Sequence, residues 1–174
     1  MKTILVLAMH GAPPNDFPKN DLAELMGLHH QLEITPGHQQ AMLLERYSEL
    51  QTRVRSWPRT PLNDLFFAGS TELAQQLEET SGLRVLLGFN EFCAPSLDQT
   101  LERAASSAEQ VLVITPMVTR GGEHSEKDIP ASISRVRLHH PEVSFIYVWP
   151  FDIGDVAMFL SEQILKQMKR ASRI

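Results

Sequence analysis

The chain has 174 residues, of which 43% are hydrophobic and 21% charged, and its formal net charge is −5. These values are typical of a globular domain and exclude a disordered chain, a collagen-like repeat and a coiled coil. The acidic balance disfavours nucleic acid as a partner, because phosphate neutralisation needs an excess of Lys and Arg. The single cysteine, Cys93, excludes an internal disulfide and a cysteine-based zinc site, so any metal must be bound by His and carboxylate.

The N-terminal apolar run, Thr3 to Met9, is too short for a secretory signal and is not followed by a small-residue cleavage site. No apolar run approaches the roughly 18 residues that indicate a membrane span. We therefore expect a cytoplasmic protein without a membrane partner.

Four short apolar runs are predicted as strands: Ile4–Met9, Val85–Phe89, Val111–Thr115 and Val143–Trp149. Each run is nearly continuous rather than alternating, which is typical of parallel strands covered on both faces. Helical patterns lie between the runs. The sequence therefore predicts an α/β fold, with a doubly wound, four-stranded, mainly parallel sheet and helices on both faces.

Helix boundaries are also visible in the sequence. Thr35 and Pro36 are suited to a helix start, and Ser96 with Gln99 forms a capping box. Asp128 precedes Ile129-Pro130 and is predicted to cap another helix. Two apolar stripes at helical spacing are formed by Leu43, Tyr47, Leu50, Val54 and Trp57, and by Val156, Leu160, Ile164 and Met168.

We expect residues 1–174 to form a single domain. Residues 11–36 begin with several prolines and are expected to form a long loop, which in a compact domain is usually functional or mobile. Residues 58–82 are expected to be an insert that carries a short helix around Thr71–Thr80.

Candidate ligands follow the predicted strands. His10 ends the first strand, Glu91 follows the second, and His124 follows the third. In open α/β sheets ligands bind outside the carboxyl ends of the strands, so these side chains are expected on one edge. Imidazole and carboxylate suit Co²⁺, Ni²⁺, Fe²⁺ or Zn²⁺, and neutral imidazole also accepts protons. The alternatives are that His10 starts a turn, that His124 is an exposed loop residue and that Glu91 is a solvated acid.

The other histidines are explained by structural or surface roles. His139 and His140 end a helix and fit a structural role at its negative end. His29, His30 and His38 fit surface positions, with the alternative that they cover a site. Cys93 is expected to be buried and inert. Gly121-Gly122 matches neither a P-loop nor a dinucleotide-binding fingerprint.

Three motifs carry a family resemblance: His10-Gly11, the stretch from Gly88 to Leu97, and the stretch from Gly121 to Pro130. Together they resemble the sirohydrochlorin cobaltochelatase family, which groups with ferrochelatases among the class II tetrapyrrole chelatases. The third motif, Gly-Gly followed by His-x-x-x-Asp-Ile-Pro, is the most specific. The resemblance implies that the fold is one chelatase-like lobe.

The resemblance implies ATP-independent insertion of a divalent metal into sirohydrochlorin or a similar tetrapyrrole, with no organic cofactor. Cobalt is the expected metal substrate, with Fe²⁺ and Ni²⁺ as alternatives. His10, Glu91 and His124 match the family's metal-binding and catalytic positions. Arg120, with Gly121 and Gly122, is expected to contact the carboxylates of the substrate, because guanidinium binds carboxylates well. The alternative is that Arg120 is a solvated loop residue.

A full chelatase of this class has two lobes, and this chain has strands for one. The resemblance therefore implies a homodimer, in which a second subunit or the 11–36 segment walls the site. Two other functions stay open at this point. One is a non-catalytic carrier of metal or tetrapyrrole. The other is a small α/β binding or interaction domain in which the histidine placement is accidental.

Overall fold

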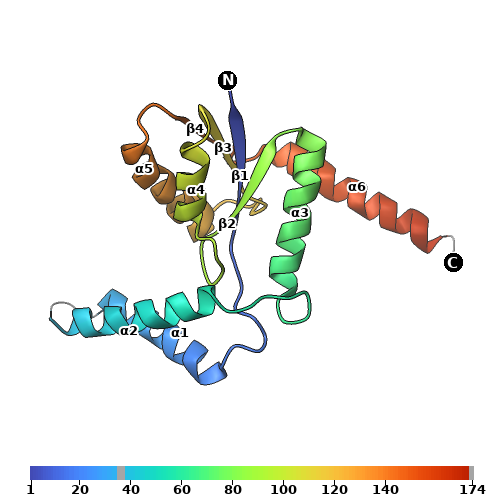
Figure 1. Ribbon diagram of the computed structural model, residues 1–174. Coiled ribbons are helices and arrows are strands. Elements are labelled where there is room, and N and C mark those ends of the chain that lie inside the picture. The colour runs from blue at the N-terminus through green and yellow to red at the C-terminus, as the bar shows by residue number, and fades with distance from the viewer. Residues whose placement is uncertain (35–37, 173–174) are drawn as a thin grey trace.

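The computed structural model describes residues 1–34 and 38–172. Its sheet has four strands in the order β2-β1-β3-β4, and every neighbouring pair is parallel. The strands are β1 (Thr3–Met9), β2 (Arg84–Phe89), β3 (Gln110–Ile114) and β4 (Ser144–Tyr147). Each coincides closely with a predicted apolar run, so the predicted doubly wound α/β architecture is confirmed (Figure 1).

Continuous apolar strands arise here because helices cover both sides of β1. Six of its seven residues are buried. On one side Ile4 and Val6 pack against α4 (Leu97–Ala105) and α5 (Ile129–His139). On the other side Leu7 and Met9 belong to a cluster that packs against α3 (Leu65–Ser81). The central strand therefore holds the two layers together, and its carboxyl end is fixed rigidly.

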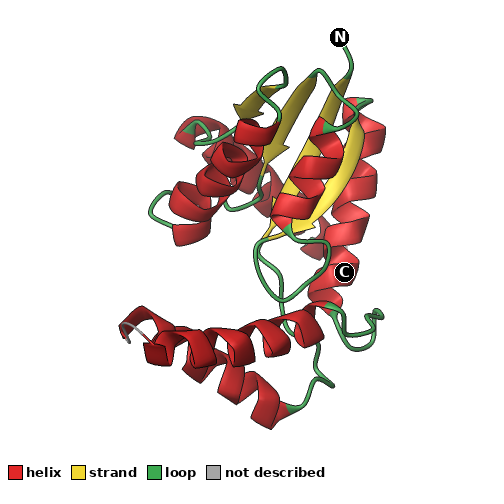
Figure 2. Cartoon of the chain, turned by 60° about the vertical axis from the view of Figure 1, so that its left-hand side comes forward, coloured by secondary structure: helices red, strands yellow, loops and turns green. Residues whose placement is uncertain are grey.

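A helical hairpin extends from the end of the sheet at which β1 finishes (Figures 1 and 2). It consists of α1 (Lys19–Ile34) and α2 (His38–Arg55). The hairpin has a small core of its own, formed by Phe17, Leu25, Leu28, Leu50 and Val54.

The expected loop over 11–36 is therefore wrong for residues 19–34, which form α1. Pro13, Pro14 and Pro18 all precede the first residue of the helix, and the buried residues of α1, Leu25 and Leu28, pack on α2. The expected helix start at Thr35 and Pro36 lies outside the described residues.

The 58–82 segment also differs from the prediction. Its helix, α3, is not short: it spans 17 residues and covers one side of the sheet. Asp64 caps its start by accepting a hydrogen bond from the Phe67 amide, and Gly82 ends it in the left-handed conformation at φ 67°. The segment is thus part of the core layer and not an addition to it.

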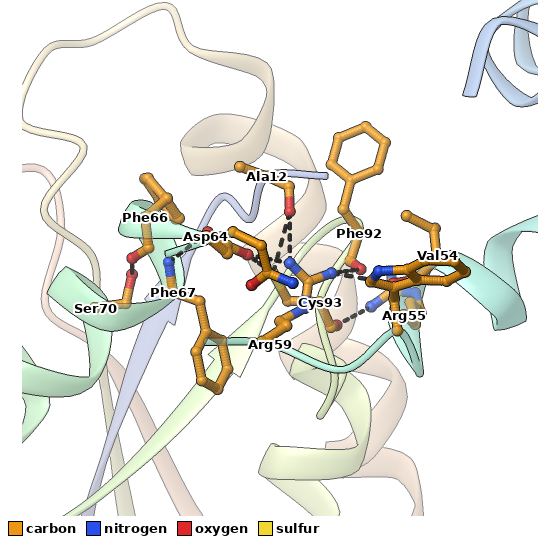
Figure 3. Close-up of polar contacts among 12 residues, drawn as sticks. Ala12, Val54, Arg55, Arg59, Asp64, Phe66, Phe67, Ser70, Phe92 and Cys93 are labelled. Carbon is orange, nitrogen blue, oxygen red and sulfur yellow. Dashed lines mark hydrogen bonds and ion pairs between the residues drawn. The ribbon is translucent and has the colours of Figure 1, made fainter. Parts of the chain in front are cut away.

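Arg59 ties the hairpin to the sheet (Figure 3). Its guanidinium donates to the carbonyl oxygens of Ala12 (2.8 Å), Val54 (3.0 Å) and Phe92 (2.5 Å), and it forms a salt bridge with Asp64. The two charged side chains are only 4% and 1% exposed. Because the acceptors follow β1, end α2 and follow β2, one side chain fixes three separate segments.

In the second half of the chain one predicted helix cap is confirmed and another, at Asp128, is wrong. The Ser96–Gln99 capping box is present at the start of α4. A short π-helix, η1 (His124–Asp128), leads directly into α5. The chain closes with α6 (Ile153–Ala171), which projects away from the sheet (Figure 1). Within residues 1–34 and 38–172, no helix combines the length and the apolar character needed to cross a bilayer.

Candidate metal centre

His10 and Glu91 lie side by side because their strands are neighbours. The ladder between β1 and β2 continues past both strands: the Asn90 amide donates to the Met9 carbonyl (2.9 Å) and the Glu91 amide to the His10 carbonyl (2.8 Å). Gly11 allows the close approach of the two loops. It has φ 100°, and a Cβ atom there would lie 1.9 Å from the Glu91 carbonyl oxygen.

His124 comes from the next strand over. The loop after β3 turns at Gly121, which has φ 88°, and enters η1 with His124 as its first residue. Ser125 fixes this turn, since its hydroxyl donates to the Gly122 carbonyl and its own carbonyl accepts from the Tyr147 hydroxyl at 3.1 Å. A single turn of π-helix is a frequent feature of functional sites. Here it directs an imidazole toward the ends of β1 and β2.

The three side chains converge. One ligand atom from each of His10, Glu91 and His124 lies within 4.8 Å of the other two. Glu91 lies between the histidines, with its carboxylate oxygens 4.0 Å from His10 Nδ1 and 3.9 Å from His124 Nε2. The two imidazole rings are 4.6 Å apart. Donors around a tetrahedral ion at about 2.1 Å are roughly 3.4 Å apart, so small side-chain rotations would suffice to close the group on an ion.

The electrostatics favour neutral imidazole at His10. Partial burial lowers the pKa of His10, and the neighbouring His124 lowers it further, while the Glu91 carboxylate partly opposes this shift. A neutral ring keeps a lone pair for a metal or a proton. The His10 side chain is 46% exposed and the Glu91 side chain 38%, so both are open to an incoming molecule.

Asp128 does not cap α5, contrary to the sequence prediction. It already has helical backbone angles at the end of η1, and its side chain makes no cap hydrogen bond. Instead its carboxylate lies 2.5 Å from His124 Nδ1. This contact leaves the other ring nitrogen, Nε2, facing Glu91. A carboxylate behind a metal-binding imidazole fixes the ring orientation and raises its basicity.

We expect Asp128→Ala to weaken the binding of a divalent ion by about 10- to 100-fold, because the His124 ring loses its orienting partner. Asp128→Asn should retain more affinity, since its amide oxygen can still accept from Nδ1. Titration calorimetry with Co²⁺ would measure both. Glu123→Ala is the matched control, because Glu123 is on the same turn but pairs with Lys127. Equal affinities for Asp128→Ala and the control would contradict this role.

Arg120, Gly121 and Gly122 lie on the loop that leads to His124. Arg120 is 67% exposed, is paired with Glu126 and places its guanidinium 5.5 Å from the Trp149 ring. The Gly121 amide donates to the same Glu126 carboxylate. The glycines thus shape the turn before η1, and Arg120 remains accessible to a ligand.

Sequence reasoning did not identify two hollows that border Glu91. One, of about 140 Å³, is lined by hairpin residues including Met26, His29 and Tyr47. The other, of about 290 Å³, also includes Tyr47 and lies beside Arg55, together with Asp98, Asp128 and Arg135. No local motif marks these residues, because only the docking of the hairpin brings them beside the ends of the strands.

The remaining candidates are elsewhere. His139 and His140 both contact the carboxylate of Glu102, at 2.8 and 2.7 Å, which confirms their structural role at the end of α5. Cys93 is fully buried, as expected, and burial raises the pKa of its thiol.

Comparison with known proteins agrees with this architecture. A family model described as CbiX matches residues 68–167, which is more than half of the chain. The chain belongs to the CbiX family. The matched region contains Glu91 and His124, whereas His10 lies outside it.

Two curated relatives are sirohydrochlorin cobaltochelatases. The protein from Priestia megaterium is 27% identical over 79 residues, covering 45% of this chain and 26% of that protein. The protein from Methanopyrus kandleri is 30% identical over 60 residues, covering 34% and 42% respectively. This CbiX chain thus matches less than half the length of either relative.

A solved structure of a CbiX protein from Marinobacter aquaeolei VT8 has the same fold. It superposes with a TM-score of 0.56 at 16% identity, and the match covers 99% of both chains. The similarity therefore extends to the helical hairpin and to α6, which lie outside or at the end of the matched family region.

Proposed function

We propose that this CbiX protein inserts a divalent metal ion into sirohydrochlorin or a similar tetrapyrrole without using ATP, and that cobalt is its metal. The observation that carries the proposal is the convergence of His10, Glu91 and His124 at one edge of the sheet. The names of the curated relatives support the substrate and the metal.

The arrangement suits transfer of a metal rather than storage. Three ligands, two imidazoles and one carboxylate, leave coordination positions free for the nitrogen atoms of an incoming ring. The ligand set fits Co²⁺, and it also fits Fe²⁺ and Ni²⁺. Because the group is partly exposed at the strand ends, a planar macrocycle can approach it directly.

Metal insertion also requires a base, since two pyrrole N–H protons must leave the ring. We assign this role to the histidines, with His10 as the first acceptor. Its lowered pKa keeps it neutral at working pH, and its ring is the most exposed of the three candidate ligands. Glu91 would stabilise the imidazolium that forms.

The substrate carries carboxylates, so cationic side chains near the site should orient it. We propose Arg120 as one contact, with the backbone turn at Gly121 and Gly122 presenting it. Arg55 and Arg135 also line the larger hollow beside Glu91, but Arg55 already donates to the Asn90 and Cys93 carbonyls and Arg135 is paired with Asp98, so Arg120 is the preferred contact. Guanidinium binds carboxylate in a bidentate geometry, which fixes orientation as well as charge.

A homodimer completes the proposal. The hairpin supplies one wall beside Glu91, through Met26 and His29. We propose that a second copy of the chain supplies the opposite wall of the site. In two-lobed chelatases the second lobe of the same chain supplies that wall.

The test is anaerobic incubation with sirohydrochlorin and Co²⁺, Fe²⁺ or Ni²⁺ in turn, with the absorption spectrum of the ring as readout. We expect conversion by the native protein and at least a hundredfold slower conversion by His10→Ala and His124→Ala. His139→Ala serves as the control, because that histidine pairs with Glu102 away from the site. Native rates in both site variants would refute the assignment. Metal or ring binding without conversion would favour the carrier function.

A further inference from the structure

A polar stripe on α2 borders the candidate metal centre. Tyr47, Gln51 and Arg55 follow one another at intervals of four residues, which places them on one face of the helix. All three line the larger of the two hollows beside Glu91, and Tyr47 and Gln51 also line the smaller one. Tyr47 is therefore shared by both hollows and lies close to a proposed metal ligand.

The smaller hollow lies between segments that are fixed to each other, and its size is that of a substituent. Its volume is about 140 Å³, whereas sites that enclose a whole small ligand measure about 300–1,000 Å³. It can admit a side chain of a macrocycle but not the ring itself. Arg55 joins the two sides of the hollow, because its guanidinium donates from α2 to the Asn90 and Cys93 carbonyls at 2.7 and 2.8 Å. The segment between these carbonyls supplies Glu91 and Phe92 to the hollow.

The lining of the smaller hollow combines apolar walls with hydrogen-bond donors. Buried aliphatic side chains of the hairpin core supply the apolar surface. The Tyr47 hydroxyl accepts from the Gln51 amide at 3.1 Å, and within the described part of the chain its own proton is not donated to any acceptor. Partial burial raises the pKa of Tyr47, and the Glu91 carboxylate raises it further, so the hydroxyl keeps this proton. The His29 imidazole, whose ring is 5.8 Å from the Tyr47 ring, offers a second donor.

We propose that this hollow binds one carboxylate-bearing side chain of the tetrapyrrole, with the Tyr47 hydroxyl and the His29 imidazole as donors to the carboxylate. The methylene groups of such a side chain match the apolar walls, and a charged acceptor strengthens the hydrogen bond from a neutral donor. The Glu91 charge opposes a second carboxylate until Glu91 holds a metal ion. The inference rests on the proposed function, because it names a contact with the same substrate. Tyr47 and His29 thus position the ring and select it by its rim.

The first experiment measures the affinity of the metal-free protein for free-base sirohydrochlorin through the fluorescence of the ring. Tyr47→Phe removes the hydroxyl and keeps the aromatic ring. We expect it to bind about tenfold more weakly and to raise KM by a similar factor, with kcat and Co²⁺ affinity nearly unchanged. Ser48→Ala is the matched control, because Ser48 is exposed beside Tyr47 on α2 and also loses a hydroxyl. Native affinity in Tyr47→Phe would overturn the proposal.

A series of charges at the rim of the hollow identifies the occupant. Met26 lines the hollow and is 54% exposed. Met26→Lys should tighten the binding of sirohydrochlorin by about three- to fivefold, Met26→Glu should weaken it by a similar factor, and Met26→Leu should leave it unchanged. Met42→Lys is the control for overall charge, because Met42 is 77% exposed on the same hairpin and does not line the hollow. Equal or weaker binding by Met26→Lys would indicate an apolar occupant and overturn the carboxylate assignment.

These measurements separate the inference from the proposed function. If the native protein inserts metal and Tyr47→Phe retains the native KM, the contact in the hollow is overturned and the reaction stands. If the native protein binds sirohydrochlorin but inserts no metal, the reaction fails, and the charge series at Met26 still decides what the hollow binds. If the native protein does not bind sirohydrochlorin, both fail. Circular dichroism of each variant verifies that the fold is retained.

Discussion

Arg59→Met should lower the free energy of unfolding by about 3–5 kcal/mol, because it leaves the buried Asp64 carboxylate without its cation. The Asp64 side chain is 1% exposed, so water cannot replace the lost partner. The carbonyls of Ala12, Val54 and Phe92 lose a donor at the same time. Chemical denaturation with urea would measure the loss.

The matched control is Arg46→Met. Arg46 pairs with Glu24 and Glu49, but it is 41% exposed on the hairpin surface. Surface ion pairs contribute about 0–1 kcal/mol. Both variants replace an arginine by methionine, so the difference between their free energies of unfolding measures the effect of burying the ion pair. If the two variants were equally stable, Arg59 would not hold the segments together.

A double variant sharpens the interpretation. Asp64→Asn keeps an oxygen that can accept from the Phe67 amide at the start of α3, but it removes the charge. Combined with Arg59→Met, it should recover part of the lost stability, because no unpaired ion stays buried. No recovery would indicate that the carbonyl contacts carry the effect and not the ion pair.

The sheet could be predicted from the sequence because its strands are buried on both sides. Runs such as Val111–Thr115 are continuous and short, a pattern that few other structures share. Parallel order then places all strand ends at one edge. His10, Glu91 and His124 could therefore be grouped without coordinates, since His10 and Glu91 come just after the first two strands and His124 comes at the end of the loop that follows the third.

The hairpin could not be predicted in the same way. The proline-rich start of residues 11–36 hid α1, whose apolar residues Leu25 and Leu28 pack on α2 and not on the sheet. Its contribution to the hollows beside Glu91 depends on this docking. Arg59 contacts both the hairpin and the segments that follow β1 and β2, yet an isolated arginine between two prolines has no distinguishing pattern in the sequence.

The role of Asp128 could not be predicted from the sequence for a different reason. Asp followed by Ile-Pro is a strong pattern for a helix cap. The structure places a π-helical turn before α5, so Asp128 lies inside helical backbone and its carboxylate reaches His124. A spacing of four residues between His and Asp is compatible with both roles, and only the backbone geometry decides between them.

Gly11→Ala is expected to separate the metal ligands while leaving every one of them in the chain. The added Cβ would lie 1.9 Å from the Glu91 carbonyl oxygen, and the residue has φ 100°, where an L side chain is strained. The loops that carry His10 and Glu91 must therefore move apart. We expect at least a tenfold loss of Co²⁺ affinity by calorimetry, with a destabilisation of about 1–3 kcal/mol.

Gly27→Ala provides the comparison, because the space around Gly27 is open and this glycine lies within α1. Alanine there should leave the affinity unchanged and slightly stabilise the helix. Gly11→Ala with native affinity would show that the ladder from Met9 to Glu91 does not set the spacing of the ligands. If only Gly11→Ala loses Co²⁺ affinity, the close backbone contact between the two loops is what brings the ligands together, because this variant removes none of them.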